Sequence, residues 1–158
     1  MSSSAWTVRP MEQQHLEGCA NIIDGSSFFS EWGLRGEKIA QGLLGELEAG
    51  DADLRVLVDE ENHVQGFAWL MPRGAFGRSA YLRLIAISED QRQKGGGRQL
   101  MESLEREYLA SHGIALLVTS ENMGARQFYE KLGYEQVGLL PDYIKDGIDE
   151  CLYLKQSR

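Results

Sequence analysis

The first half of the chain alternates between stretches with strand periodicity and stretches with helical periodicity. Residues 6–10 (WTVRP) are expected to form a short strand that ends at Pro10. The stretches 11–24 and 37–49 both place apolar side chains at helical spacing. The aromatic segment 25–33 (GSSFFSEWG), which lies between them, is predicted to be a loop. The pattern therefore predicts one strand followed by two helices.

The second half of the chain predicts a hairpin and a further strand, and then helices that alternate with strands. Residues 54–72 alternate around a polar turn at 60–62, which is typical of a β-hairpin, and a third strand is expected at 80–88. The remaining predicted elements are a helix that begins near Gly97, a strand at 114–120, a helix at 122–133 and strands at 134–138 and 149–155. This order describes an α/β domain with a mixed sheet, in which the two later helices provide crossovers.

Length and composition favour one globular domain over residues 1–158. The chain is 42% hydrophobic and 25% charged, which suits a soluble protein with its own core. Its longest apolar runs, such as 114–118, are far too short to cross a bilayer, and residues 1–14 lack the apolar core of a signal peptide. We therefore expect a cytoplasmic protein that has no membrane partner.

The charge and the two cysteines exclude further classes of function. A formal net charge of −8 argues against a nucleic-acid partner, because phosphate binding normally needs a basic surface. The same charge suits a cationic substrate, although an acidic solvated surface explains it equally well. Cys19 and Cys151 lie near opposite ends of the chain without CxxC spacing, so we expect buried thiols and neither a disulfide nor a metal site.

Three consecutive glycines, at 95–97, follow a cluster of basic and amide side chains and precede the helix expected from Gly97. Because glycine is costly inside a helix, the run indicates a loop whose backbone amides must be reachable. Successive N–H groups in such a turn, together with the positive end of the following helix, can hold a phosphate. A merely flexible surface turn is the alternative. The spacings of a dinucleotide-binding turn and of a P-loop are both absent.

Two motifs in this order resemble the GNAT family of acyl-CoA-dependent N-acyltransferases. Arg92, Gly95 and Gly97 fit the family's loop pattern of Arg or Gln, two residues, Gly, one residue, and Gly or Ala. The later stretch 121–134 (ENMGARQFYEKLGY) fits the family's Asn, Ala, Phe-Tyr and Leu-Gly-Tyr positions. The resemblance implies a GNAT fold, with a mixed, mostly antiparallel sheet of about seven strands and about four helices. Gly96 departs from the usual aliphatic residue, which implies a more mobile loop and weaker coenzyme binding.

The resemblance also implies roles in binding acetyl-CoA. The backbone of the fourth strand would lie against the pantetheine arm, and the N–H of Ile87 would donate to the thioester oxygen. Asn122 resembles the family's amide contact to pantetheine, but an Asn before a helix is equally a good N-cap. Tyr129 matches the tyrosine that protonates the departing thiolate, and Arg92, Lys94 and Arg98 would be charge partners of the pyrophosphate. The implied coenzyme-binding residues are Ile85, Ala86, Ile87, Arg92, Gln93, Lys94, Gly95, Gly96, Gly97, Arg98, Asn122 and Tyr129.

The acceptor side of the reaction is less defined by the sequence. An alkyl ammonium of pKa about 10.4 must lose a proton, which costs about 4.6 kcal/mol at pH 7. Several family members carry a glutamate early in the fourth strand, where this chain has Tyr81. Glu31 or Glu89 could act as the base through water, but each equally suits a solvated surface charge, and the amine could also enter neutral.

The family's acceptor pocket is framed by the loop between the first two helices and the loop between the last two strands. Arg83, in an otherwise apolar strand, would need an anionic partner if its side chain were buried. The aromatic loop equally suits a hydrophobic plug. The implied acceptor residues are Phe28, Phe29, Glu31, Trp32, Arg83 and Tyr143.

The resulting hypothesis is an N-acetyltransferase that uses acetyl-CoA to acylate a primary amine by direct attack in a ternary complex. Tyr129 would be the general acid, Ile87 the oxyanion donor and Glu31 a candidate base. The alternative is a non-catalytic acyl-CoA-binding sensor or interaction module. The acceptor, either a small molecule or a peptide amine, stays open, as do the use of other acyl groups and the oligomeric state, including a homodimer.

Overall fold

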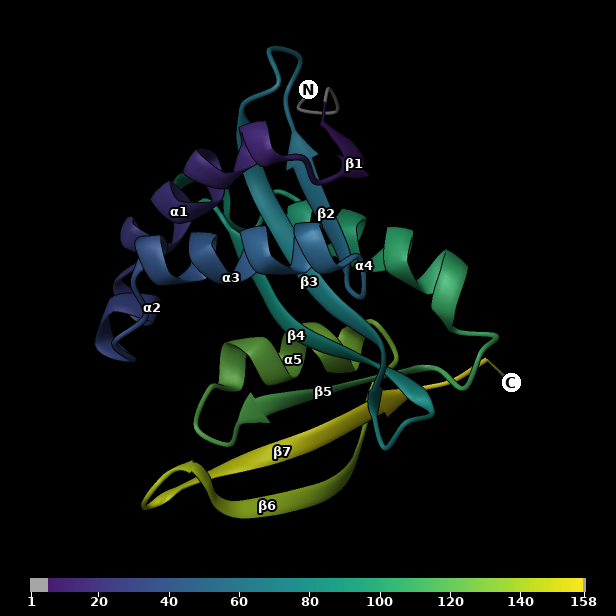
Figure 1. The fold of residues 1–158 in the computed structure, drawn as a ribbon. Helices are drawn as coiled ribbons and strands as arrows, with labels where there is room; N and C mark the ends of the chain where they lie inside the picture. Colours follow the sequence, from purple (N-terminus) through teal and green to yellow (C-terminus); the bar gives the residue numbers. More distant parts are fainter. Residues whose placement is uncertain (1–5, 158) are drawn as a thin grey trace.

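The computed structural model describes residues 6–157, and its centre is one seven-stranded sheet (Figure 1). The strands lie in the order β1-β2-β3-β4-β5-β7-β6. All neighbouring strands are antiparallel except β4 and β5. The bounds are Thr7–Pro10 (β1), Asp53–Val58 (β2), Val64–Ala75 (β3), Ser79–Ile87 (β4), Ile114–Thr119 (β5), Glu135–Lys145 (β6) and Ile148–Lys155 (β7). The predicted mixed, mostly antiparallel sheet is therefore confirmed.

The helices cover the two halves of the sheet differently. In Figure 1, α1 and α3 lie over β2 and β3 on one face, whereas α4 and α5 lie on the other face. The bounds are Leu16–Asp24 (α1), Ser27–Glu31 (α2), Gly36–Ala49 (α3), Gly96–Tyr108 (α4) and Met123–Lys131 (α5), with 3-10 turns at Gln13–His15 and Glu89–Gln91. Within residues 6–157, none of these helices has the length and apolar character that a membrane crossing requires.

Two hydrophobic clusters hold these layers together. The first joins α4 and α5 to the sheet and includes Leu100, Leu104, Leu116 and Tyr153. The second joins α1 and α3 to β2, β3 and β4 and contains no buried residue of β5, β6 or β7. The C-terminal half of the sheet is therefore covered by a helix on one face only. Cys19 and Cys151 are buried free thiols, as the sequence predicted.

Two expectations from the sequence were wrong. The segment 25–33 is not simply a loop, because residues Ser27–Glu31 form α2, whose first turn is capped by the Ser26 hydroxyl accepting from the Phe29 N–H. The strands β3 and β6 also run past Pro72 and Pro141. Proline is tolerated at both places because β2 no longer pairs with β3 there, and because β6 is an edge strand.

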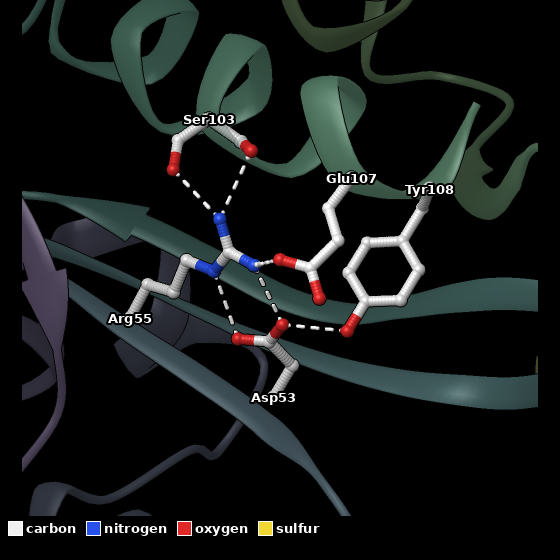
Figure 2. A network of polar contacts seen from close by, with 5 residues as sticks. All are labelled: Asp53, Arg55, Ser103, Glu107 and Tyr108. Atoms are coloured by element: carbon white, nitrogen blue, oxygen red, sulfur yellow. Dashed lines mark hydrogen bonds and ion pairs between the residues drawn. The ribbon is translucent and has the colours of Figure 1, made fainter. Parts of the chain in front are cut away.

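A polar network fixes α4 to the start of β2 (Figure 2). Arg55 donates to both carboxylate oxygens of Asp53, at 2.8 and 2.7 Å, and to Ser103 and Glu107 on α4. Tyr108 donates to Asp53 at 2.6 Å. Burial alone would raise the pKa of Asp53, but the hydrogen bonds from Arg55 and Tyr108 outweigh it and lower the pKa. The ionised carboxylate is therefore the form that the fold stabilises.

Replacing Asp53 by Asn should lower the free energy of unfolding at pH 7 by about 1–3 kcal/mol, because Arg55 loses its bidentate partner. Since the pKa of Asp53 is depressed in the folded state, this difference should be complete above the ordinary value of 3.8 and disappear as the pH falls through the folded value. Urea unfolding between pH 3 and 7 measures it. Glu107→Gln is the control and should cost under about 1 kcal/mol, because its side chain is 59% exposed. Equal losses in both variants would contradict the assigned role of Asp53.

Candidate functional site

The loop between β4 and α4 presents backbone amides that no side chain caps. Gln93 and Gly95 adopt positive φ values of 65° and 91°. Gly95 is the N-cap of α4, and having no side chain it leaves the first-turn N–H groups of the helix without a side-chain acceptor. The other helix beside this region, α5, is capped by Asn122. The loop and the start of α4 therefore form a concave set of donors that suits a phosphate.

Close packing explains the second and third glycines of the loop. A Cβ at Gly96 would lie 2.9 Å from Leu57 Cδ2, and a Cβ at Gly97 would lie 3.1 Å from Phe128 Cζ. Gly96 is itself buried. The departure from an aliphatic residue at this position is thus a packing requirement of this chain. The greater mobility and weaker coenzyme binding inferred from it stay predictions.

Three cationic side chains surround the loop and stay available to a ligand. Arg92, Lys94 and Arg98 are all exposed. Arg92 makes only a long hydrogen bond of 3.5 Å to the Ser26 hydroxyl, and Arg98 makes an exposed ion pair of 3.5 Å with Glu102. Exposed pairs of this kind contribute little to stability, so these guanidinium groups can change partners at small cost.

Beside this loop, β4 and β5 move apart. Their pairing consists of Ala80, Tyr81 and Leu82 with Ile114, Ala115 and Leu116 and then ends. Ser88 donates its N–H to Gln65 of β3, and peptide groups alternate along a strand. The backbone groups of Ile85 and Ile87 therefore point away from β3 into the gap, whereas those of Ala86 face β3. Of the three residues predicted to contact pantetheine, Ile85 and Ile87 offer free backbone groups.

Helix α5 brings Asn122 and Tyr129 to the other side of the gap. The Asn122 side chain accepts from the Ala125 N–H at 3.1 Å, which confirms the N-cap interpretation and leaves its amide nitrogen without a partner among the described residues. Tyr129 is 6% exposed, and its ring stacks edge-on against Phe128 and Tyr134. Burial raises the pKa of the Tyr129 hydroxyl, so this group keeps its proton at neutral pH.

The Tyr129 hydroxyl has no hydrogen-bond partner in the described chain, and the residue is 6% exposed. Among residues 6–157, the fully buried side-chain oxygens without a partner belong to Glu105 and Tyr134. A protonated hydroxyl that is not engaged with another group is what a proton donor requires.

The two segments predicted to frame the acceptor pocket do meet. The ammonium group of Lys145, at the end of β6, lies 5.2 Å from the ring centroid of Trp32, which follows α2. Phe28 stacks on both Phe29 and Trp32. Only Phe29 of these packs against the hydrophobic core, so the aromatic group is a partly exposed wall and not a plug.

The remaining predicted acceptor residues lie on the strands, and the proposed bases lie on the surface. Arg83 is the extra residue of a register shift in β4, is exposed, and stacks 4.2 Å over the Trp69 ring. Because the Arg83 side chain is exposed, the condition under which it would need an anionic partner does not apply. Tyr143 is 62% exposed, and both Glu31 and Glu89 are exposed. Glu89 accepts a hydrogen bond from Ser27.

A hollow of about 390 Å³ lies between the end of α1 and the segment that follows β4. Its lining comprises Asn21, Ile22, Gly25, Ser88, Glu89 and Asp90. It adjoins the glycine loop and is acidic on one side. In the described chain, Asp59, Glu61 and His63 also come close together, but they lie in the β2–β3 turn, where Asp59 accepts the N–H groups of the other two.

Glu150, which is 2% exposed on β7, is a further polar residue of this region that neither sequence motif includes. Its Oε2 accepts from the Thr119 hydroxyl at 3.1 Å. The signal was present in the stretch 149–155 (DECLYLK), where Glu150 lies on the same strand face as Leu152 and Leu154. A carboxylate in line with two leucines indicates a buried polar group.

Comparisons of the sequence find similar proteins that are named as acetyltransferases. The chain is similar to an N-alpha-acetyltransferase of Saccharolobus solfataricus, with 33% identity over 120 residues that cover 66% of this chain and 69% of that protein. It is similar to an uncharacterized N-acetyltransferase of Methanocaldococcus jannaschii, with 36% identity over 76 residues that cover 46% of this chain and about half (49%) of that protein.

The fold is shared with solved structures at low identity. The ribosomal-protein-S18-alanine N-acetyltransferase of Escherichia coli superposes with a TM-score of 0.75 at 18% identity, covering 97% of this chain and 96% of the other. The model of the acetyltransferase (GNAT) family matches residues 23–134, which include the glycine loop, the gap between β4 and β5, and Tyr129. The chain therefore belongs to the GNAT family of acetyltransferases.

Proposed function

We propose that the chain transfers the acetyl group of acetyl-CoA to a primary amine. The observation that carries the proposal is the juxtaposition of an uncapped glycine loop with a gap between β4 and β5 that exposes the peptide groups of Ile85 and Ile87. One relative is named as an N-alpha-acetyltransferase, which favours an α-amine such as a peptide N-terminus among the acceptors.

Acetyl-CoA supplies a thioester, so that R–NH3⁺ and acetyl-CoA give R–NH–CO–CH3, the free coenzyme thiol and one proton. The amides at residues 93–98 would hold the pyrophosphate, with Arg92, Lys94 and Arg98 as its charge partners. The N–H of Ile87, or that of Ile85 one pleat earlier, would stabilise negative charge on the carbonyl oxygen. The amide nitrogen of Asn122 would bind the pantetheine arm.

Tyr129 would donate a proton to the departing sulfur. A thiol has an ordinary pKa near 8.5, so the departing sulfur needs little assistance beyond an adjacent hydroxyl. The pKa of Tyr129 is raised by burial, which keeps the donor protonated across the neutral range. The rings of Phe128 and Tyr134 both pack edge-on against the Tyr129 ring, which gives the hydroxyl a defined position.

Isothermal calorimetry with acetyl-CoA tests binding, and release of free thiol tests turnover. We expect saturable micromolar binding of acetyl-CoA, no comparable binding of ATP, and thiol release with a hexapeptide that has a free N-terminal alanine or with spermidine. Binding without thiol release from a broad amine panel would instead support the alternative of a non-catalytic acyl-CoA sensor. The absence of binding at millimolar acetyl-CoA would overturn both functions.

Replacing Gly95 by Val should weaken acetyl-CoA binding by about 10-fold or more, because a β-branched residue cannot hold a φ of 91° without strain and the loop amides would turn away. Gly77→Val is the matched control. Gly77 has a φ of 68° and, like Gly95, open space around a Cβ, but it lies in the β3–β4 turn at the opposite end of β4. Calorimetry should find that Gly77→Val binds acetyl-CoA with unchanged affinity. An equal loss of acetyl-CoA affinity in both variants would argue against phosphate binding by the amides of the glycine loop.

Replacing Tyr129 by Phe should lower kcat by about 10²-fold with little change in acetyl-CoA affinity, because only the proton donor is removed. Tyr134→Phe is the control, since it deletes a hydroxyl from the adjoining ring that is sealed from solvent. Steady-state thiol release on both variants makes the comparison. Full activity in Tyr129→Phe would remove Tyr129 from the mechanism.

A further inference from the structure

Glu150 is an ionisable group that the fold buries without a cation. It is 2% exposed, and among residues 6–157 it is the one acidic residue that is buried. No ion pair involves it in this part of the chain, and its one hydrogen bond comes from the uncharged Thr119 hydroxyl. A buried carboxylate is unfavourable unless a cation or several donors compensate it. A cationic group next to Glu150 would therefore be stabilised by its carboxylate.

Glu150 faces the side of the sheet that carries the predicted acceptor residues. Its neighbours Cys151 and Tyr153 belong to the cluster under α4 and α5, so Glu150 points to the opposite face. Thr119 and Tyr81 point to that same face, because Val118 and Leu82 belong to the same cluster as Cys151. This is the face of α1 and α3, and no residue of β5 or β7 is part of the core beneath those two helices.

The position of Glu150 along the strands also places it at the gap. Thr119, its partner on β5, lies three residues beyond Leu116, where the pairing of β5 with β4 ends. Glu150 is three residues from the β6–β7 turn, whose Lys145 reaches Trp32 after α2. It thus lies between the opened strands and the two segments that frame the acceptor site.

The groups around the carboxylate leave it uncompensated. Tyr81 of β4 interacts electrostatically with Glu150, and also with Arg83 and with Tyr143 of β6. Arg83 is the cation of this group, but its guanidinium stacks over the Trp69 ring and forms no ion pair within residues 6–157. Burial raises the pKa of Glu150, and the hydrogen bond from Thr119 lowers it in part. The Thr119 hydroxyl bonds to Oε2, and Oε1 has no hydrogen-bond partner among the described residues.

We propose that Glu150 binds the ammonium group of the acceptor and takes its proton, an inference that rests on the proposed N-acetyltransferase activity. An N–H bond of R–NH3⁺ breaks, an O–H bond forms on Glu150, and the electron pair stays on nitrogen for attack on the thioester. Glu150 then releases the proton to solvent, which is the proton of the overall reaction. The base that the sequence did not identify is therefore supplied by β7.

The pH dependence of kcat/KM tests the proposal with three variants. In the wild-type enzyme, kcat/KM should rise through a pKa above the ordinary value of 4.5, because Glu150 must be ionised to accept the proton. Glu150→Gln should lower kcat/KM by about 10²-fold and remove this acidic limb, which is the rise of kcat/KM with pH. Asp149→Asn, with the same loss of charge on the same strand, should change neither. A wild-type profile retained in Glu150→Gln would overturn the proposal.

Thr119 offers a graded test that leaves the carboxylate in place. Thr119→Val removes the hydrogen bond that lowers the pKa of Glu150, so the acidic limb should move to higher pH. Thr119→Ser keeps the hydroxyl and should restore the wild-type limb. A limb that stays in place in Thr119→Val would show that the group titrating in kcat/KM is not Glu150.

A carboxyl titration separates this inference from the proposed function. The ¹³C signal of Glu150, assigned with Glu150→Gln, is followed in the protein with bound coenzyme A. The Ala-terminated hexapeptide or spermidine should lower the midpoint of Glu150, because a nearby cation favours the ionised form. The N-acetylated hexapeptide should not. If no thiol is released but an amine lowers the titration midpoint of Glu150, ammonium binding is supported without the transferase activity. If neither amine changes that midpoint, the proposed role of Glu150 is overturned.

Discussion

The early end of pairing between β4 and β5 is the constraint on which the rest of the molecule depends. Three residue pairs join these strands, and beyond Leu82 and Leu116 each strand keeps only its outer neighbour. The inner edges then carry peptide groups that no strand satisfies. Such groups require a polar partner when they are buried. The gap therefore selects for an extended ligand with alternating donors and acceptors, or for water, and it divides the sheet into halves with different helix cover.

The glycines near this gap hold its walls close together. A Cβ at Gly66 would lie 2.6 Å from Ile87 Cδ1, and a Cβ at Gly97 would press on Phe128. The Ile87 side chain is thus fitted between β3, the start of α4 and α5. Because α4 carries the glycine loop on its N-terminus, the same packing positions the phosphate-binding amides relative to the β4 backbone. The positions of the loop amides relative to β4 therefore depend on glycines, which have no side chain to keep these elements apart.

Local patterns predicted most of the fold, and the errors arose where tertiary context overrides them. Apolar periodicity predicted both ends of α3 and the start of α4 within one residue, whereas the stretch 11–24 begins five residues before α1. The two motifs indicated the glycine loop and Tyr129. The strand expected to end at Pro72 continues to Ala75, and the strand expected at 134–138 continues past Pro141 to Lys145. Both prolines lie where no partner strand needs their missing N–H. The acceptor side was harder, because Glu150 and Thr119 are 31 residues apart and meet only through the pairing of β5 with β7. Sequence spacing carries no trace of that contact.

The contact between Trp32 and Lys145 joins the segment that follows α2 to the end of β6. An exposed cation–π pair of this kind contributes about 0.5–1 kcal/mol. Moving Lys145 away from Trp32 therefore costs little free energy. Neither residue belongs to the two hydrophobic clusters, so such a movement leaves the packing of the sheet and its helices unchanged.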